Sequence, residues 1–383
     1  MNKTNSLSRV LPVLFGFFVM GFVDIVGIST SYVQKDFNLS DAVANLLPMM
    51  VFLWFLVFSV PTGLLMNKLG RKNTVLLSMA ITFIAMLIPL IAYSYAMALL
   101  AFALLGIGNT ILQVSLNPLV SNVVNKEKLT SRLTLGQFIK AVASFLGPII
   151  AGFAAATLGN WKMLFPIFAG ITLLSSLWLW IVPIPEDARN EKTTSFGAAF
   201  GLLKDKTILF LFLGILAVVG VDVGMNTATP RILMERGGLP LEQAGLGTSL
   251  YFAARTLGAL TGAIFLAKFA AVGFFRVSMI AATGAMIIML FSQSAVSVLI
   301  LVAIIGFALA NIFSIIFSMA LQKHPERGNE ISGLMIMGVS GGAIMPPLMG
   351  LASDAFGQIG GMLVIVAGMF YLLLTAFFVL KRD

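Results

Sequence analysis

The chain has 383 residues, of which 59% are hydrophobic and only 10% are charged, and its mean hydropathy is +1.02. A soluble domain carries roughly 25% charged residues, so this composition excludes a soluble globular fold. Cysteine is absent and histidine occurs once, which excludes disulfides, thiol nucleophiles and clustered histidine metal sites.

Apolar stretches of about 20 residues, the length that crosses roughly 30 Å of hydrocarbon as a helix, follow one another along the chain. Short segments of alternating polarity, typical of membrane β-barrels, do not occur. We therefore predict an all-α polytopic membrane protein with twelve transmembrane helices. The expected spans are 9–32, 43–67, 73–93, 96–124, 131–157, 162–183, 207–233, 242–267, 274–292, 295–321, 330–353 and 359–380.

The longest polar segment lies between the sixth and seventh spans. It divides the chain into an expected N-terminal six-helix bundle, residues 1–183, and a C-terminal six-helix bundle, residues 207–383. Between them, residues 184–206 are expected to form a cytoplasmic linker with a short amphipathic helix at the membrane surface.

The loop charges predict the orientation. With both termini in the cytoplasm, the outer side holds only Lys35, Lys162, Arg231 and Arg236, and nearly all other lysines and arginines lie inside. The net charge of +9 thus follows from membrane topology and indicates no nucleic-acid partner.

The two halves share local patterns at nearly constant separation. Asp24 and Asp222 each lie in a similar phrase, Gly-Phe-Val-Asp24-Ile-Val-Gly and Val-Gly-Val-Asp222-Val-Gly, deep in an apolar stretch. Leu53-Trp54-Phe55 likewise corresponds to Leu250-Tyr251-Phe252. A carboxylate near the bilayer centre costs at least about 2.5–3.5 kcal/mol, so such residues usually mark ion or substrate pathways. Two repeated bundles with an ionisable centre are typical of a transporter.

The loop after the second span reads Gly63-Leu-Leu-Met-Asn67-Lys68-Leu-Gly70-Arg71-Lys72. It resembles the signature of the major facilitator superfamily, with Asn67 in place of an aspartate. We predict a gating and topology element at Gly63, Asn67, Gly70, Arg71 and Lys72. Its glycines allow a tight turn and its cations meet a neighbouring helix end.

Two further sequence motifs resemble those of a narrower family. Leu112-Gln113-Val-Ser-Leu-Asn117-Pro118 and Met337-Gly-Val-Ser-Gly341-Gly342-Ala-Ile-Met-Pro346-Pro347 resemble the fucose–proton symporter family, which includes fucose and glucose/galactose permeases. Asp24 matches the span-one aspartate of that family. Lys140 stands where the family usually has asparagine, and Asp222 where glutamate is more usual. The resemblance implies two pseudo-symmetric six-helix bundles in the major facilitator fold.

Helical spacing places amides on shared faces. Asn109, Gln113 and Asn117 are four residues apart, and Gln137, Lys140 and Ser144 share a face of the fifth span. Amides supply paired donors and acceptors suited to sugar hydroxyls, although such stripes also form helix–helix hydrogen bonds. Aromatic residues, among them Trp54, Tyr251, Phe138 and Tyr32, could stack on a pyranose. The predicted substrate-binding residues are Asn109, Gln113, Asn117, Gln137, Lys140, Asn226, Asn311 and Trp54.

The predicted proton-coupling residues are Asp24, Asp222 and Lys140. A buried lysine tends to lose its proton unless it is paired, so we hypothesise that Lys140 approaches Asp24. An alternative ion pair would join Arg255 to Asp222.

The sequence shows no nucleotide-binding loop, catalytic triad or metal-ligand cluster, so we predict no enzyme, no cofactor and no metal. We expect a monomeric sugar importer of the bacterial inner membrane that is coupled to protons. A facilitator or proton antiporter for an amphiphilic or apolar solute, and a non-transporting sugar sensor, remain alternatives.

Overall fold

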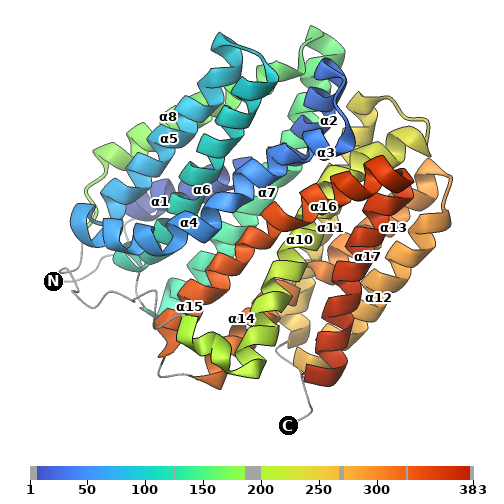
Figure 1. Cartoon of the computed structure of the whole chain (residues 1–383). Coiled ribbons are helices and arrows are strands. Elements are labelled where there is room, and N and C mark those ends of the chain that lie inside the picture. The colour runs from blue at the N-terminus through green and yellow to red at the C-terminus, as the bar shows by residue number, and fades with distance from the viewer. Residues whose placement is uncertain (1–6, 125, 186–199, 267–270, 325–326, 380–383) are drawn as a thin grey trace. The chain divides into compact units, whose positions relative to one another are not determined.

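The structure, a computed structural model, describes residues 7–124, 126–185, 200–266, 271–324 and 327–379. Within these ranges the backbone is helical almost throughout and contains no strand, so the all-α prediction is confirmed (Figure 1). Eleven helical segments in this part of the chain are long and apolar enough to cross a membrane. A further 26-residue helix, α11 (Leu241–Leu266), lies where the sequence predicts the eighth span.

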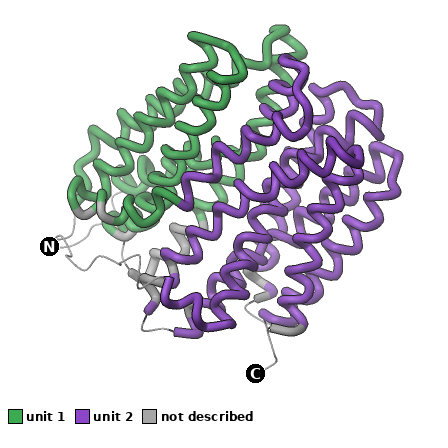
Figure 2. The backbone as a smooth tube through the Cα atoms, viewed as in Figure 1, with its two compact units in different colours: residues 1–25, 57–194 green, residues 26–56, 195–383 purple. Residues whose placement is uncertain are grey.

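The described chain separates into two compact units (Figure 2). Unit 1 comprises residues 1–25 and 57–194, and unit 2 comprises residues 26–56 and 195–383. Residues 26–56 thus belong to the same compact unit as the second half of the chain. The predicted two-bundle division with its linker at 184–206 stays a prediction, and most of that linker, residues 186–199, lies outside the described residues.

In unit 1, helix α5 packs against α6 and α8, while α1 packs against α6, α7 and α8. The elements that contribute to this unit are α1 (Leu7–Met20), η1 (Gly21–Ile25), part of α4 (Leu46–Leu69), α5 (Arg71–Ile91), α6 (Tyr95–Val123), α7 (Lys126–Leu158), η2 (Trp161–Met163) and α8 (Leu164–Ile181).

In unit 2, the long helix α10 is central and packs against α2, α11, α14, α16 and α17. Besides α11 and the first part of α4, the elements of this unit are α2 (Val26–Phe37), α3 (Asp41–Ala44), η3 (Leu202–Lys204), α10 (Lys206–Glu235), α12 (Ala271–Phe291), α13 (Ala295–Leu309), α14 (Ile312–Lys323), α15 (Gly328–Met337), η5 (Gly338–Ser340), α16 (Gly341–Phe356), α17 (Gln358–Leu374) and the π-helical turn η6 (Thr375–Val379).

Asp205 begins α10. Its Oδ1 accepts hydrogen bonds from the backbone amides of Thr207 and Ile208, at 2.8 and 3.4 Å. Its other oxygen lies 2.9 Å from Nε2 of His324, the single histidine of the chain. The hydrogen bond from His324 is the main cause that lowers the pKa of Asp205. An aspartate in this position satisfies amides that have no partner within the helix.

Several spans change helix type near their middle. The first span passes from α1 through the 3₁₀ segment η1 into α2, and the eleventh passes from α15 through η5 into α16. Both breaks coincide with glycines, which are poor helix formers, at Gly21 and at Gly338 and Gly341. A 3₁₀ stretch inside a helix often marks a functional hinge, and η1 contains Asp24.

Candidate functional site

Asp24 lies in the 3₁₀ break of the first span and is half-buried. Its Oδ2 accepts a hydrogen bond of 2.5 Å from the hydroxyl of Ser144 on α7. Ser144 is only 2% exposed, and its hydroxyl also lies 3.1 Å from the backbone carbonyl of Lys140. Asp24 therefore accepts a hydrogen bond from α7, the helix that carries Lys140.

Lys140 is half-buried and lies one helical turn before Ser144. Its backbone carbonyl lies against Gly21, where a Cβ atom would approach that oxygen to 2.5 Å. Only glycine permits this close approach between the 3₁₀ break and α7. The backbone of Lys140 thus lies beside the segment that holds Asp24, while the pairing of the two side chains stays a prediction.

The amide stripe of α6 forms a chain of hydrogen bonds. Nδ2 of Asn109 donates to the carbonyl of Met20 at 2.8 Å, and Nε2 of Gln113 donates to Oδ1 of Asn109 at 2.7 Å. Nδ2 of Asn117 lies 3.4 Å from the Gln113 carbonyl. Met20 is the last residue of α1, so Asn109 satisfies a carbonyl at the start of the break. Asn109 thus makes a helix–helix hydrogen bond, the alternative that the sequence left open, whereas the bonds of Gln113 and Asn117 lie within α6.

Burial divides the predicted unit 1 residues into two groups. Asn109 is 1% exposed and bonds the protein itself, whereas Gln113 and Asn117 are half-buried and Gln137 is exposed. The accessible amides are therefore those of Gln113, Asn117 and Gln137. Their contact with a substrate stays a prediction.

In unit 2, Asp222 on α10 contacts two residues of α11. Nη1 of Arg255 forms an ion pair with Oδ1 of Asp222, and the hydroxyl of Tyr251 donates to the same oxygen at 2.6 Å. The pairing of Arg255 with Asp222 is confirmed. Tyr251 is 0% exposed and Tyr32 is 3% exposed, so neither presents a ring for sugar stacking in this structure.

The two unit 2 asparagines predicted to bind substrate are buried. Asn226 is 2% exposed and lies against the backbone of Gly27 in α2. Asn311 is 7% exposed and its Nδ2 donates to the Gly258 carbonyl at 2.8 Å. Trp54 on α4 is half-buried. A direct role for these residues in substrate binding stays a prediction.

The predicted gating element begins near the end of α4. Gly63 is half-buried in that helix, and the Asn67 side chain lies outside the described part of the structure. Gly70 has a φ of 85°, a left-handed conformation that favours glycine, and it leads directly into α5. The tight turn predicted here is confirmed.

The cations of this element bond to backbone carbonyls, as predicted. Nζ of Lys72 lies 3.0 Å from the carbonyl of Trp180 and 2.8 Å from that of Val182, at the end of α8. Nη1 of Arg71 donates to the Pro118 carbonyl at 3.2 Å and to the side chain of Asn122. A cation at a helix C-terminus is favourable because it meets the negative end of the helix dipole. The gating role itself stays a prediction.

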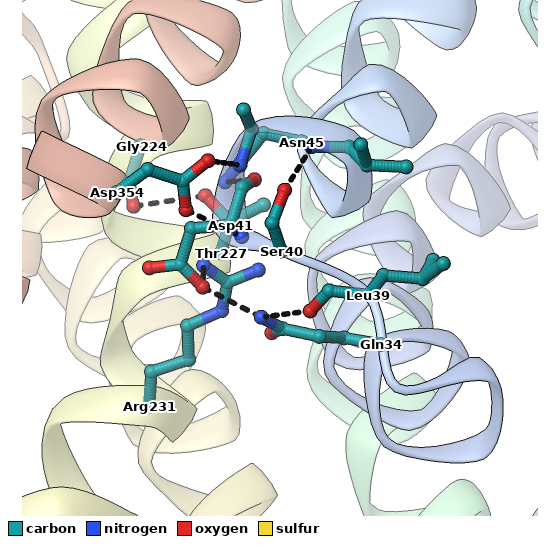
Figure 3. A network of polar contacts seen from close by, with 11 residues as sticks. Gln34, Leu39, Ser40, Asp41, Asn45, Gly224, Thr227, Arg231 and Asp354 are labelled. Atoms are coloured by element: carbon teal, nitrogen blue, oxygen red, sulfur yellow. Dashed lines mark hydrogen bonds and ion pairs between the residues drawn. The ribbon is translucent and has the colours of Figure 1, made fainter.

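Sequence reasoning missed a polar network in unit 2 (Figure 3). Both carboxylate oxygens of Asp354, on α16, accept hydrogen bonds from the backbone amides of Asp41 and Ala42, at 2.9 and 3.1 Å. Oδ1 of Asp41 pairs with Nη1 of Arg231 at 2.8 Å and accepts from Nε2 of Gln34 at 2.6 Å. We call Gln34, Asp41, Arg231 and Asp354 the α3 network.

A small, partly open pocket adjoins the α3 network and is lined by Asp41, Arg231 and Gln358 among others. Nε and Nη2 of Arg231, which are buried, have no hydrogen-bond partner in the described part of the chain. One sequence signal pointed to this region. Arg231 is one of the four cations predicted on the outer side, where cations are rare.

Residues 13–328 match the sequence profile of the Major Facilitator Superfamily. The chain belongs to this superfamily. It is 24% identical over 360 residues to a glucose/galactose transporter of Brucella abortus, covering 89% of this chain and 86% of that one. A putative glucose/galactose transporter of Helicobacter pylori is 23% identical over 375 residues, covering 92% and 91%.

Solved structures share the major facilitator fold. An E. coli fucose:proton symporter matches with a TM-score of 0.69 at 18% identity, covering 97% of this chain and 98% of that one. A nucleoside transporter matches with a TM-score of 0.83 at 14% identity, covering 98% and 100%. At these identities the likeness concerns the fold alone. This major facilitator is a multi-pass membrane transporter and not an enzyme.

Proposed function

We propose that this major facilitator is a secondary active transporter that imports a monosaccharide, a hexose or deoxyhexose, together with protons. The observation that carries the proposal is the half-buried carboxylate of Asp24 in the break of the first span, bonded to Ser144 beside Lys140. An ionised carboxylate within the membrane region is costly. Protonation of Asp24 removes that charge and lowers the barrier to reorientation of the loaded carrier.

Sugar binding is assigned to the accessible amides of unit 1. Gln113, Asn117 and Gln137 supply donors and acceptors that suit sugar hydroxyls, and Asn109 holds Gln113 through its hydrogen bond of 2.7 Å. The names of the Brucella and Helicobacter relatives support a hexose substrate. The fold shared with a fucose:proton symporter supports the coupling to protons.

Alternating access requires contacts that open in turn at the two membrane faces. Helix α4 begins at Leu46, five residues after Asp41 of the α3 network, and ends at Leu69, within the gating element. A helix of 24 residues is about 36 Å long at 1.5 Å per residue, enough to cross the hydrocarbon core. The topology predicted from the loop charges puts Asp41 on the outer side and the gating element on the cytoplasmic side of this span, and the α3 network holds Asp41 and Ala42 against α10 and α16.

We place the transporter in the bacterial inner membrane as a monomer, with both termini in the cytoplasm. The scarcity of lysine and arginine in the predicted outer loops supports this orientation. The bacterial relatives support the compartment.

Proteoliposomes that hold a trapped pH indicator test the function. Addition of glucose, galactose or fucose outside is expected to acidify the lumen, because sugar and proton enter together. Alkalinisation of the lumen indicates the antiport alternative. Sugar uptake without a pH change indicates a facilitator, and binding without uptake indicates a sensor. Each of these three outcomes contradicts proton-coupled import.

A further inference from the structure

The second membrane carboxylate, Asp222, is held by two residues with different burial. Tyr251 is 0% exposed, whereas the side chains of Asp222 and Arg255 are 21% and 25% exposed. The phenol and the guanidinium contact the same oxygen, Oδ1 of Asp222. Of the two partners of Asp222, Tyr251 is therefore buried and Arg255 is partly exposed.

Packing fixes the orientation of Tyr251. Its ring meets Phe252 edge-on, with centroids 5.5 Å apart and planes at 73°. Its backbone and ring lie so close to Gly306 of α13 that a Cβ atom there would approach the Tyr251 carbonyl to 2.6 Å. The hydroxyl of Tyr251 is consequently a donor with little freedom to turn away from Asp222.

Asp222 lies near the middle of α10, which has 30 residues. Apart from Arg255, the charged side chains described on the helices packed against α10 lie at or near helix ends. The same helices carry two further tyrosines. These residues are Lys35 and Asp36 of α2, Lys204 of η3, Glu242 of α11, Lys323 of α14, Asp354 of α16, Tyr32 of α2 and Tyr371 of α17. The contacts of Asp222 are instead with Tyr251 and Arg255, both on α11.

We infer that Tyr251 is a positioning residue for the Asp222–Arg255 ion pair, and that this pair opens when Asp222 takes up a proton during transport. The inference rests on the proposed function. A proton on Asp222 neutralises the carboxylate, so Arg255 loses its counter-charge and its guanidinium can turn to the oxygen atoms of a bound sugar. Release of the proton restores the pair. The hydroxyl of Tyr251 donates to the same carboxylate oxygen that Arg255 contacts, so it holds that oxygen in place for the ion pair.

The test uses Tyr251→Phe, which removes one oxygen atom and keeps the ring. Concentrative uptake of glucose, galactose and fucose is measured in proteoliposomes as a function of pH, with folding verified by thermal unfolding. Because Tyr251 and Arg255 contact one oxygen of Asp222, loss of the hydroxyl is expected to shift the midpoint of the pH profile by about one pH unit. Tyr371→Phe is the matched control, because its hydroxyl donates to the carbonyl of Phe210 at 3.1 Å, twelve residues before Asp222 on α10, and its profile is expected to match the wild type.

Two further variants complete the test. In an Asp222→Asn background, Tyr251→Phe is expected to cause no additional shift, because the two residues act through one contact. Arg255→Lys keeps the charge and Tyr251 but loses the guanidinium geometry, and is expected to shift the midpoint in the same direction. A wild-type profile in Tyr251→Phe or Arg255→Lys, or an equal shift in the Asp222→Asn background, overturns the inference. Absence of sugar-dependent proton uptake in the wild type instead overturns the proposed function.

Discussion

The carboxylate of Asp354 accepts a hydrogen bond of 2.9 Å from the backbone amide of Asp41, although the two residues lie 313 positions apart in the sequence. Its second oxygen accepts from Ala42, and Asp41 in turn pairs with Arg231 (Figure 3). This arrangement ties the segment before the second span to α10 and α16. Asp41 and Ala42 belong to residues 26–56, which share unit 2 with α10 and α16.

Substitution Asp354→Asn is expected to loosen this attachment. An amide retains one acceptor oxygen but no charge, so we expect a loss of about 1–2 kcal/mol in the free energy of unfolding. Thermal unfolding of the purified protein measures the loss. Ser353→Ala, at the adjacent position, is the control.

The chain has no native cysteine, so Ala44→Cys, at a position that is 0% exposed, provides a direct readout of opening. Maleimide should label it faster in the Asp354→Asn background, and equal labelling rates would contradict the proposed attachment.

Asp24→Asn is expected to abolish concentrative sugar uptake while exchange of sugar across the membrane continues. The variant cannot release a proton from this position, yet it keeps the shape of the side chain and a partner for Ser144. Uptake and counterflow in proteoliposomes separate the two activities. Accumulation at the wild-type level would refute Asp24 as the proton carrier.

Lys140→Asn tests the predicted partner of Asp24. If the two side chains act as a pair, loss of the cation should change the pH dependence of uptake. The profile is measured with the assay used for Asp24→Asn. Lys162→Asn, outside the site, serves as the control. A profile identical to that of the wild type would show that Lys140 and Asp24 do not act together.

Asn109→Ala is expected to impair both the fold and the site. It removes the donor to the Met20 carbonyl and the acceptor for Gln113, and a buried carbonyl without a partner costs about 1–3 kcal/mol. We expect a lower unfolding temperature together with a raised KM for the sugar. Gln113→Ala should raise KM with a smaller effect on stability. Equal stability losses in the two variants would argue against the supporting role of Asn109.

The Asp205–His324 contact predicts a pH dependence of stability. The pKa of Asp205 in the folded protein lies below its ordinary value of 3.8, chiefly because of the hydrogen bond from His324. Its carboxylate therefore contributes stability that is complete above the ordinary pKa and is lost as pH falls through the lowered one. The difference in unfolding temperature between the wild type and Asp205→Asn should persist from pH 8 to pH 5 and shrink below about pH 4. A difference that grows on acidification would contradict this assignment.

Local patterns in the sequence predicted much of this protein. Hydropathy alone indicated the helices, and the glycines and cations around Gly70 and Lys72 predicted a tight turn beside a helix end. The spacing of Asn109, Gln113 and Asn117 correctly placed these amides on one stripe. Spacing could not show that Asn109 bonds Met20, since that depends on the position of the break in another span.

The amino-acid sequence by itself determined the membrane class, the positions of the spans and the presence of ionisable groups within them, because hydrophobicity and helical periodicity are properties of neighbouring residues. Only the tertiary structure decided which partner each polar group has. Asp24 bonds Ser144, Tyr251 bonds Asp222, and Asp354 bonds the segment at Asp41. Partners are chosen by the packing of distant helices, because a polar group removed from water must find its hydrogen bond wherever the fold places a complementary atom.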